Sequence, residues 1–84
     1  MQNSVKKYLK HHNINNYTTV YLSETDKFFT VEVEHFQNKH LNTTNRYKKE
    51  KYASLSECRA KAEARYYKHI NKIEQIIKDS KFQK

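Results

Sequence analysis

The chain has 84 residues, a formal net charge of +8, 36% hydrophobic residues, and neither glycine nor proline. This length supplies one small hydrophobic core and no material for a second domain. The absence of glycine excludes the phosphate-cradling loops of nucleotide-binding enzymes, and the positive charge favours polyanionic partners, with nucleic acid first among them.

The predicted organisation is a single α+β domain over residues 1–84. A three-stranded antiparallel sheet would pack against one long C-terminal helix, with a short N-terminal helix beside them. In chain order, the N-terminal helix and linker take residues 1–16, the sheet takes 17–53, the long helix takes 54–79, and a tail takes 80–84.

The short N-terminal helix is predicted over residues 3–12, where apolar side chains recur at helical offsets. Three lysines, Lys6, Lys7 and Lys10, would occupy the other side of this helix. The Asn-rich run 13–16 would end it. The apolar positions of the helix are Val5, Tyr8, Leu9 and His12.

Two runs rich in β-branched and aromatic residues, Tyr17–Leu22 and Phe28–Phe36, predict the first two strands. The residues between them, 23–27, have the length of a hairpin turn. Residues 37–45 are polar and predict a long, mobile loop before a third strand at Arg46–Tyr52. Lysines in that third strand suit a sheet edge that must avoid aggregation, and they suit a phosphate-binding surface equally well.

The second predicted strand has a clear period of two. Phe29, Val31 and Val33 would face the core, while Glu32 and Glu34 would share the opposite face. One face of the sheet is therefore left for solvent or for a partner.

Ser54 begins the long helix, in a capping box with Glu57. At 1.5 Å per residue, residues 54–79 extend about 39 Å, which overshoots a three-stranded sheet. The last isoleucines then need another cover, either the N-terminal helix or a second copy of the chain in a homodimer. The apolar stripe comprises Leu55, Cys58, Ala62, Tyr66, Ile70, Ile73 and Ile77, with Ile76 beside it.

The sequence predicts a protein that is not an enzyme and needs no cofactor or metal. No pair among the five histidines and one cysteine has zinc-ligand spacing that a second pair completes. Cys58 falls on the apolar stripe, where a buried thiol is ordinary. A lone cysteine forms no internal disulfide, and no apolar run has signal or membrane-spanning length, which predicts a cytoplasmic protein without a membrane partner.

Cations and tyrosines gather in and around the predicted third strand. Cations bind phosphate, and tyrosine rings stack on bases or pack along sugars. A three-stranded sheet is also slim enough to enter the major groove of DNA. The predicted phosphate contacts are Lys39, Arg46, Lys48, Lys49 and Lys51, and the predicted base or sugar contacts are Tyr21 and Tyr47.

The run Val20–Val33 resembles the first hairpin of the Apetala/ethylene-response-factor type of DNA-binding domain, which also occurs in phage integrases and homing endonucleases. Tyr52–Ala62 is similar to the strand-to-helix junction of that family, with an aromatic residue, a helix cap, an acidic residue and then alanines. The family reads DNA with its exposed sheet face. The resemblance therefore implies contacts from Tyr21, Lys48, and Lys49 or Lys51.

A second resemblance points to RNA. The order of helix, three strands and helix is also that of the double-stranded-RNA-binding domain, and Phe29–Val33 is similar to its second strand. That family binds RNA partly through its first helix. The resemblance implies such a role for the basic residues of 3–12.

A third hypothesis is a protein-binding inhibitor or adaptor of the kind found in phages and mobile elements. Four acids against one base in residues 17–36 would dock one surface, while the lysines meet another. Such a protein would block a host enzyme that acts on nucleic acid or in defence. The prediction is a small basic nucleic-acid-binding protein, with double-stranded DNA ranked above RNA and a host protein as the alternative partner. The acids are Glu24, Asp26, Glu32 and Glu34.

Overall fold

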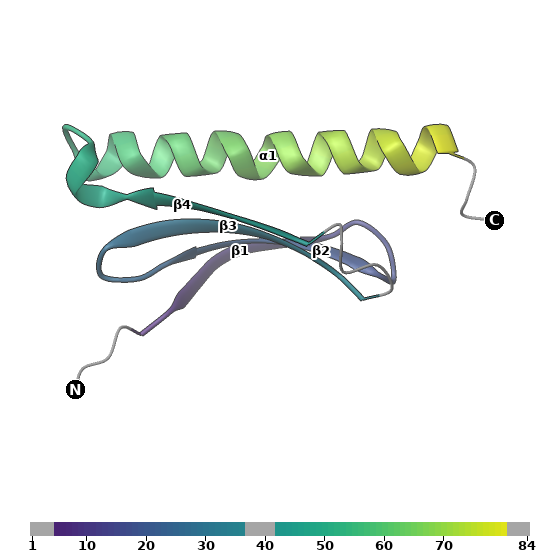
Figure 1. Ribbon diagram of the computed structural model, residues 1–84, viewed down its shortest axis with the longest axis horizontal. Coiled ribbons are helices and arrows are strands. Elements are labelled where there is room, and N and C mark those ends of the chain that lie inside the picture. Colours follow the sequence, from purple (N-terminus) through teal and green to yellow (C-terminus); the bar gives the residue numbers. More distant parts are fainter. Residues whose placement is uncertain (1–4, 37–41, 81–84) are drawn as a thin grey trace.

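The computed structural model describes residues 5–36 and 42–80, with one antiparallel sheet packed on one long helix (Figure 1). The four strands lie in the order β1-β2-β3-β4. Lys39 and most of the predicted tail fall outside the described residues. The elements are β1 (Lys7–Asn13), β2 (Thr18–Glu24), β3 (Phe28–His35), β4 (Thr43–Lys48), the 3₁₀ turn η2 (Lys49–Lys51) and α1 (Leu55–Ser80).

The predicted alternation of β3 is confirmed, and it gives the sheet two unlike faces. Val33 pairs with Val20 and Val31 pairs with Leu22, so buried residues of β2 and β3 lie side by side beneath α1. Figure 1 shows α1 along this face alone. The opposite face, called the open face below, includes Tyr8, His11, Tyr21, Glu32, Glu34 and Arg46.

The core is a single cluster between the sheet and α1. Helix positions spaced by four residues, Cys58, Ala62, Tyr66 and Ile70, are buried against five side chains of β2 and β3. Each large apolar side chain buried here contributes roughly 1.5–3 kcal/mol, which offsets the entropy of ordering the chain. The sheet side of the cluster consists of Val20, Leu22, Phe29, Val31 and Val33.

The start of α1 agrees closely with its sequence signals. The Glu57 backbone N–H donates to Ser54 Oγ at 3.1 Å, which is the cap that the capping box predicts. Leu55 departs from the predicted stripe, because its side chain is 56% exposed.

The predicted N-terminal helix is wrong, because residues 7–13 form β1 instead. β1 pairs with β2 in an antiparallel register that joins His12 to Val20 and His11 to Tyr21. A ten-residue helix has little stability of its own, whereas the edge of β2 offers unpaired backbone groups. Tertiary pairing therefore overrides the helical spacing of the apolar residues.

The prediction of three strands is also wrong, and the last strand lies earlier than expected. β4 begins at Thr43, opposite Val33, and ends at Lys48, opposite Phe28. Lys49 donates its backbone N–H to the Lys27 carbonyl at 2.9 Å, and the chain then turns through η2. Residues 43–45 thus belong to a strand rather than to the predicted loop.

The C-terminal part of α1 is only partly covered. Ile73 packs against the core, whereas Ile76 is 53% exposed. A homodimer through this end of the helix remains a prediction. No helix in the described part of the chain combines the length and apolar character that crossing a bilayer requires.

Candidate nucleic-acid interface

The cations predicted to bind phosphate do not share one surface. Arg46 lies exposed on the open face of β4, opposite Thr30, and makes no ion pair within the described residues. Lys48 lies on the same face, with its Nζ 3.5 Å from a carboxylate oxygen of Glu50. Lys51 is exposed in η2.

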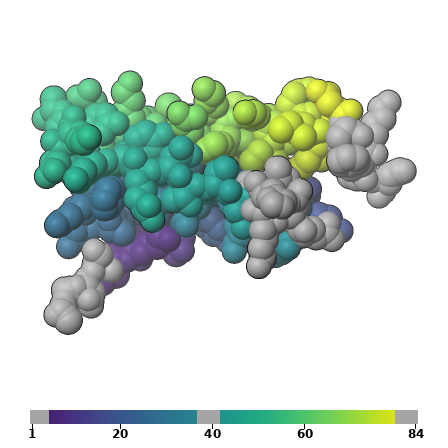
Figure 2. All heavy atoms as spheres, viewed as in Figure 1, coloured from purple at the N-terminus to yellow at the C-terminus, as the bar shows by residue number. Residues whose placement is uncertain are grey.

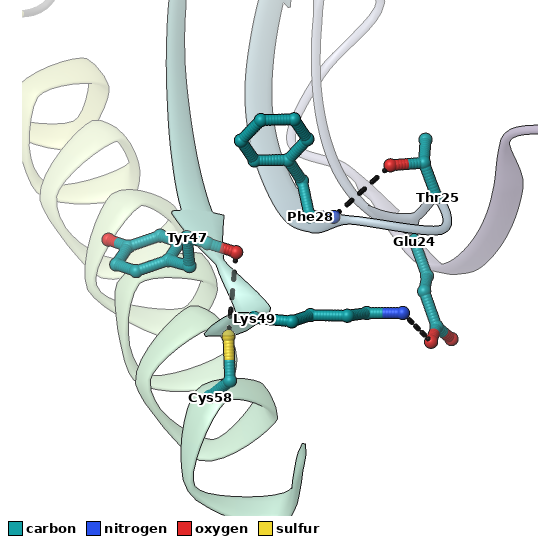
Figure 3. Close-up of polar contacts among 6 residues, drawn as sticks. All are labelled: Glu24, Thr25, Phe28, Tyr47, Lys49 and Cys58. Atoms are coloured by element: carbon teal, nitrogen blue, oxygen red, sulfur yellow. Dashed lines mark hydrogen bonds and ion pairs between the residues drawn. The ribbon is translucent and has the colours of Figure 1, made fainter. Parts of the chain in front are cut away.

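Lys49 is engaged in holding the fold together (Figure 3). Its ammonium donates to Glu24 Oε2 at 2.7 Å and lies 5.1 Å from the centroid of the Phe29 ring. The Lys49 and Glu24 side chains are only 20% and 26% exposed. This contact links η2 to the end of β2. The Lys49 ammonium is therefore already paired with a carboxylate of the chain itself.

The two predicted tyrosine contacts lie on opposite faces of the sheet. Tyr47 points towards α1 and is half-buried, and its hydroxyl accepts a hydrogen bond from Arg65 Nε at 3.0 Å. The Tyr47 carbonyl accepts a hydrogen bond from the Cys58 thiol, with sulfur and oxygen 3.4 Å apart (Figure 3). Burial raises the pKa of that thiol, which keeps it protonated and unreactive at neutral pH.

Tyr21 lies on the open face among carboxylates. Its hydroxyl donates to Glu34 Oε1 at 3.1 Å, and its ring centroid lies 5.5 Å from that of Tyr8. Burial, and then the bond to Glu34, raise the pKa of Tyr21. Glu32 lies on the same face and binds Lys6. The face implied by the DNA-binding resemblance thus carries two carboxylates, which disfavour phosphate.

A different set of cations is gathered along α1. Lys61, Arg65, Lys68 and Lys72, called the α1 cation row below, follow one another at intervals of four, three and four residues. That spacing keeps them on one side of the helix over about 16 Å. The three lysines are exposed, and Arg65 is half-buried and donates a hydrogen bond to Tyr47.

The acids of α1 between residues 61 and 74 lie on the other side of the helix, towards β1. Glu63 accepts a hydrogen bond from Arg59 Nε at 3.0 Å. Glu74 Oε2 lies 3.3 Å from Nε2 of His12 on β1. Between residues 61 and 74, the helix is therefore divided lengthwise into a cationic side and an acidic side.

Burial and the α1 cation row lower the pKa of His69, a half-buried histidine that lies between α1 and β4. Its ring nitrogen Nε2 lies 2.9 Å from Asn45 Oδ1 on β4. Burial lowers the pKa of His69 below its ordinary value of 6.5, and the charges of Arg65, Lys72 and Lys68 lower it further. Three members of the row thus lie close enough to His69 to disfavour its protonated form.

The α1 cation row has a sequence signal that the sequence-based prediction did not use. The four residues fall outside the apolar stripe, and their spacing alone assigns them to one side of a helix. The sequence instead favours β4 as the phosphate-binding element, because lysines are dense near the predicted third strand. Figure 2 shows that the surfaces of β4 and α1 adjoin along the molecule.

Comparisons with protein-family models, with curated proteins and with solved structures find no match to this chain. The resemblances to the two nucleic-acid-binding families therefore remain predictions. Within residues 5–36 and 42–80, no three side chains of histidine, cysteine or acid lie close enough together to hold a metal ion.

Proposed function

We propose that this protein binds double-stranded nucleic acid, DNA above RNA, by placing the α1 cation row along the phosphate backbone. The observation that carries the proposal is the lengthwise division of α1 between residues 61 and 74. Four cations lie on one side, and Glu63 and Glu74 are held on the other by partners of their own. Such a row releases counterions from a polyanion, and this release drives non-specific binding.

Arg65 is the best-positioned member of the row. The hydroxyl of Tyr47 holds its Nε at 3.0 Å, which restrains the guanidinium before any ligand arrives. A planar guanidinium suits phosphate oxygens in a two-pronged contact, and a restrained one loses less conformational entropy on binding. Arg65 is therefore the residue in which we expect the largest single loss of affinity.

Recognition of the backbone rather than of the bases is supported by the rings near the row. Tyr66 is buried in the core, and the Tyr47 hydroxyl is bound to Arg65. Tyr67 lies towards β1, where it accepts a hydrogen bond from Lys10. Single-strand binders need exposed rings on which bases stack, and the exposed Tyr67 ring lies on the β1 side of the helix rather than beside the row. Duplex binding with little sequence preference therefore fits the row better.

DNA is ranked above RNA because the resemblance to the RNA-binding family requires a basic first helix, which this chain lacks at residues 7–13. Residues 7–12 lie in a strand, and two of the three lysines already have partners. Lys6 binds Glu32, and Lys10 binds Tyr67. Arg46 and Lys51, both exposed, add to the positive field that attracts a duplex.

A gel-shift titration with DNA and RNA duplexes at two salt concentrations tests the proposal. Replacing Lys61, Lys68 and Lys72 with glutamine should reduce the salt dependence, as a slope of log affinity against log salt, by about 3. The control variant replaces Lys7, Lys27 and Lys48, which are exposed outside α1 and carry the same charge. Its slope should change by less than about 1.

Two results would contradict the proposal. Failure of both duplexes to bind below roughly 10 μM at low salt would remove nucleic acid as the partner. Equal losses in the two triple variants would show that net charge, rather than the α1 cation row, determines binding.

A further inference from the structure

The open face of the sheet contains a groove whose charge is opposite to that of the whole protein. The groove has a volume of about 510 Å³, and two tyrosine rings and two carboxylates line it beside the start of β4. The chain as a whole carries +8. The residues that give the groove its character are Tyr8, Tyr21, Glu32 and Glu34, with Asn42 and Thr44 at its edge.

A lysine of the chain itself shows which chemical group this face accepts. Lys6 Nζ donates to Glu32 Oε1 at 3.0 Å and lies 5.3 Å from the centroid of the Tyr8 ring. Its pKa is raised, chiefly by the hydrogen bond to Glu32. A carboxylate and an aromatic face together are a standard receptor for an ammonium group.

Glu34 offers a second position of the same kind. Its side chain is on an exposed residue of β3, and Oε1 accepts the Tyr21 hydroxyl at 3.1 Å. A carboxylate has about four acceptor sites, so this one hydrogen bond leaves room for an external donor. The Tyr21 ring, 5.5 Å from Tyr8, continues the aromatic wall from one carboxylate to the other.

We infer that this groove docks a lysine side chain of a protein partner, and that Lys6 occupies part of it in the free chain. The argument is charge complementarity. Because the chain is strongly basic, a cationic partner is repelled elsewhere and attracted at Glu32 and Glu34. This surface is separate from the α1 cation row, so the inference does not depend on nucleic-acid binding.

A short blocked peptide of alternating alanine and lysine is the probe, and NMR titration of the Tyr8 and Tyr21 ring resonances is the measurement. Saturable shifts are expected with this peptide and none with its lysine-acetylated form. Glu34→Gln should weaken binding about two- to fivefold, the usual range for an exposed ion pair. Lys6→Gln should strengthen binding by a similar factor, because it frees Glu32.

Lys7→Gln is the matched control, since it removes the same charge from the neighbouring exposed position. It should leave peptide affinity close to that of the parent chain. A gain of affinity cannot come from misfolding, so Lys6→Gln keeps the test decisive even if Glu34→Gln disturbs the sheet. Unchanged affinity in Lys6→Gln, or equal gains in both lysine variants, would overturn the inference.

A parallel titration with spermidine separates a peptide from a free polyamine. Weaker shifts with spermidine than with the peptide are expected, because the partner backbone would add contacts along the groove. Equal or stronger binding of spermidine would overturn the assignment of a protein partner.

Discussion

His69 is a half-buried histidine beside the α1 cation row, and its charge depends on folding. Burial and the neighbouring cations lower its pKa, so folding favours the neutral ring. The unfolded chain therefore takes up this proton first. The stabilisation is complete above pH 6.5 and is lost as the pH falls through the lower pKa of the folded state.

We expect His69→Gln to flatten the pH dependence of stability. Urea unfolding at about pH 7.5 and about pH 5 should show a smaller loss of unfolding free energy in this variant than in the parent chain. His11→Gln, on the open face, should keep the parent behaviour. Equal losses in the parent and the His69 variant would contradict the expected shift.

Lys49 and Lys48 are adjacent lysines with very different roles. Lys49 binds Glu24 at 2.7 Å in a half-buried contact, whereas the Lys48 and Glu50 side chains are 44% and 75% exposed at 3.5 Å. Lys49→Gln should lower the unfolding free energy by about 1 kcal/mol, and Lys48→Gln should change it little. Urea unfolding of the two variants measures the difference. Equal losses would mean that burial of the Lys49 pair contributes nothing.

At the level of elements, the start of α1 depends on the Ser54 cap. Ser54→Ala removes the acceptor of the Glu57 N–H and should cost about 1 kcal/mol of unfolding free energy. Ser56→Ala, inside the first turn, is the control and should be neutral or slightly stabilising, because alanine favours helix. Thermal or urea unfolding followed by circular dichroism measures both. A loss in Ser56→Ala as large as that in Ser54→Ala would contradict a capping role.

β1 shows how an element is decided by what lies next to it. Lys10 donates to the Tyr67 hydroxyl at 2.7 Å, and His12 approaches Glu74, so alternate residues of the strand reach α1. Tyr8 and His11 lie on the open face, near Tyr21. A helix over these residues would place one side against the rest of the molecule, whereas the strand makes side-chain contacts on both of its faces.

At the level of the whole molecule, the two proposed surfaces have opposite charge and belong to opposite layers. The α1 cation row lies on the helix layer, and the carboxylate-lined groove lies on the open face of the sheet. The proposed nucleic acid and the proposed basic partner would therefore not compete for one site. Binding at the row should weaken with salt more steeply than binding at the groove, because it involves more charges.

Self-association should respond to salt in the opposite direction. Two copies that each carry +8 repel one another, and the exposed Ile76 is the apolar side chain available near the end of the described helix. If α1 forms the predicted dimer, light scattering should show a mass that rises with salt as repulsion is screened. Ile76→Lys should abolish the rise. A mass independent of salt, or a rise that persists in the variant, would contradict a dimer through the helix.

Much of this architecture could be predicted from local patterns. The period of two in β3, the Ser54 cap and the four-residue spacing from Cys58 to Ile70 each depend on neighbours in the chain, and each is confirmed. These patterns determined the sheet-on-helix class and the helix bounds within one residue. They hold because the period of a strand or a helix is set by backbone geometry.

The tertiary structure alone decided the identity of β1, the register of β4 and the grouping of charges. The sequence places Lys48 next to Lys49, yet the Lys48 side chain lies on the open face, whereas the Lys49 side chain binds Glu24. It separates Lys6 from Glu32 by 26 positions, yet they form an ion pair. Strand pairing and charge contact depend on distance through space, and only the packed chain defines which distant residues are neighbours.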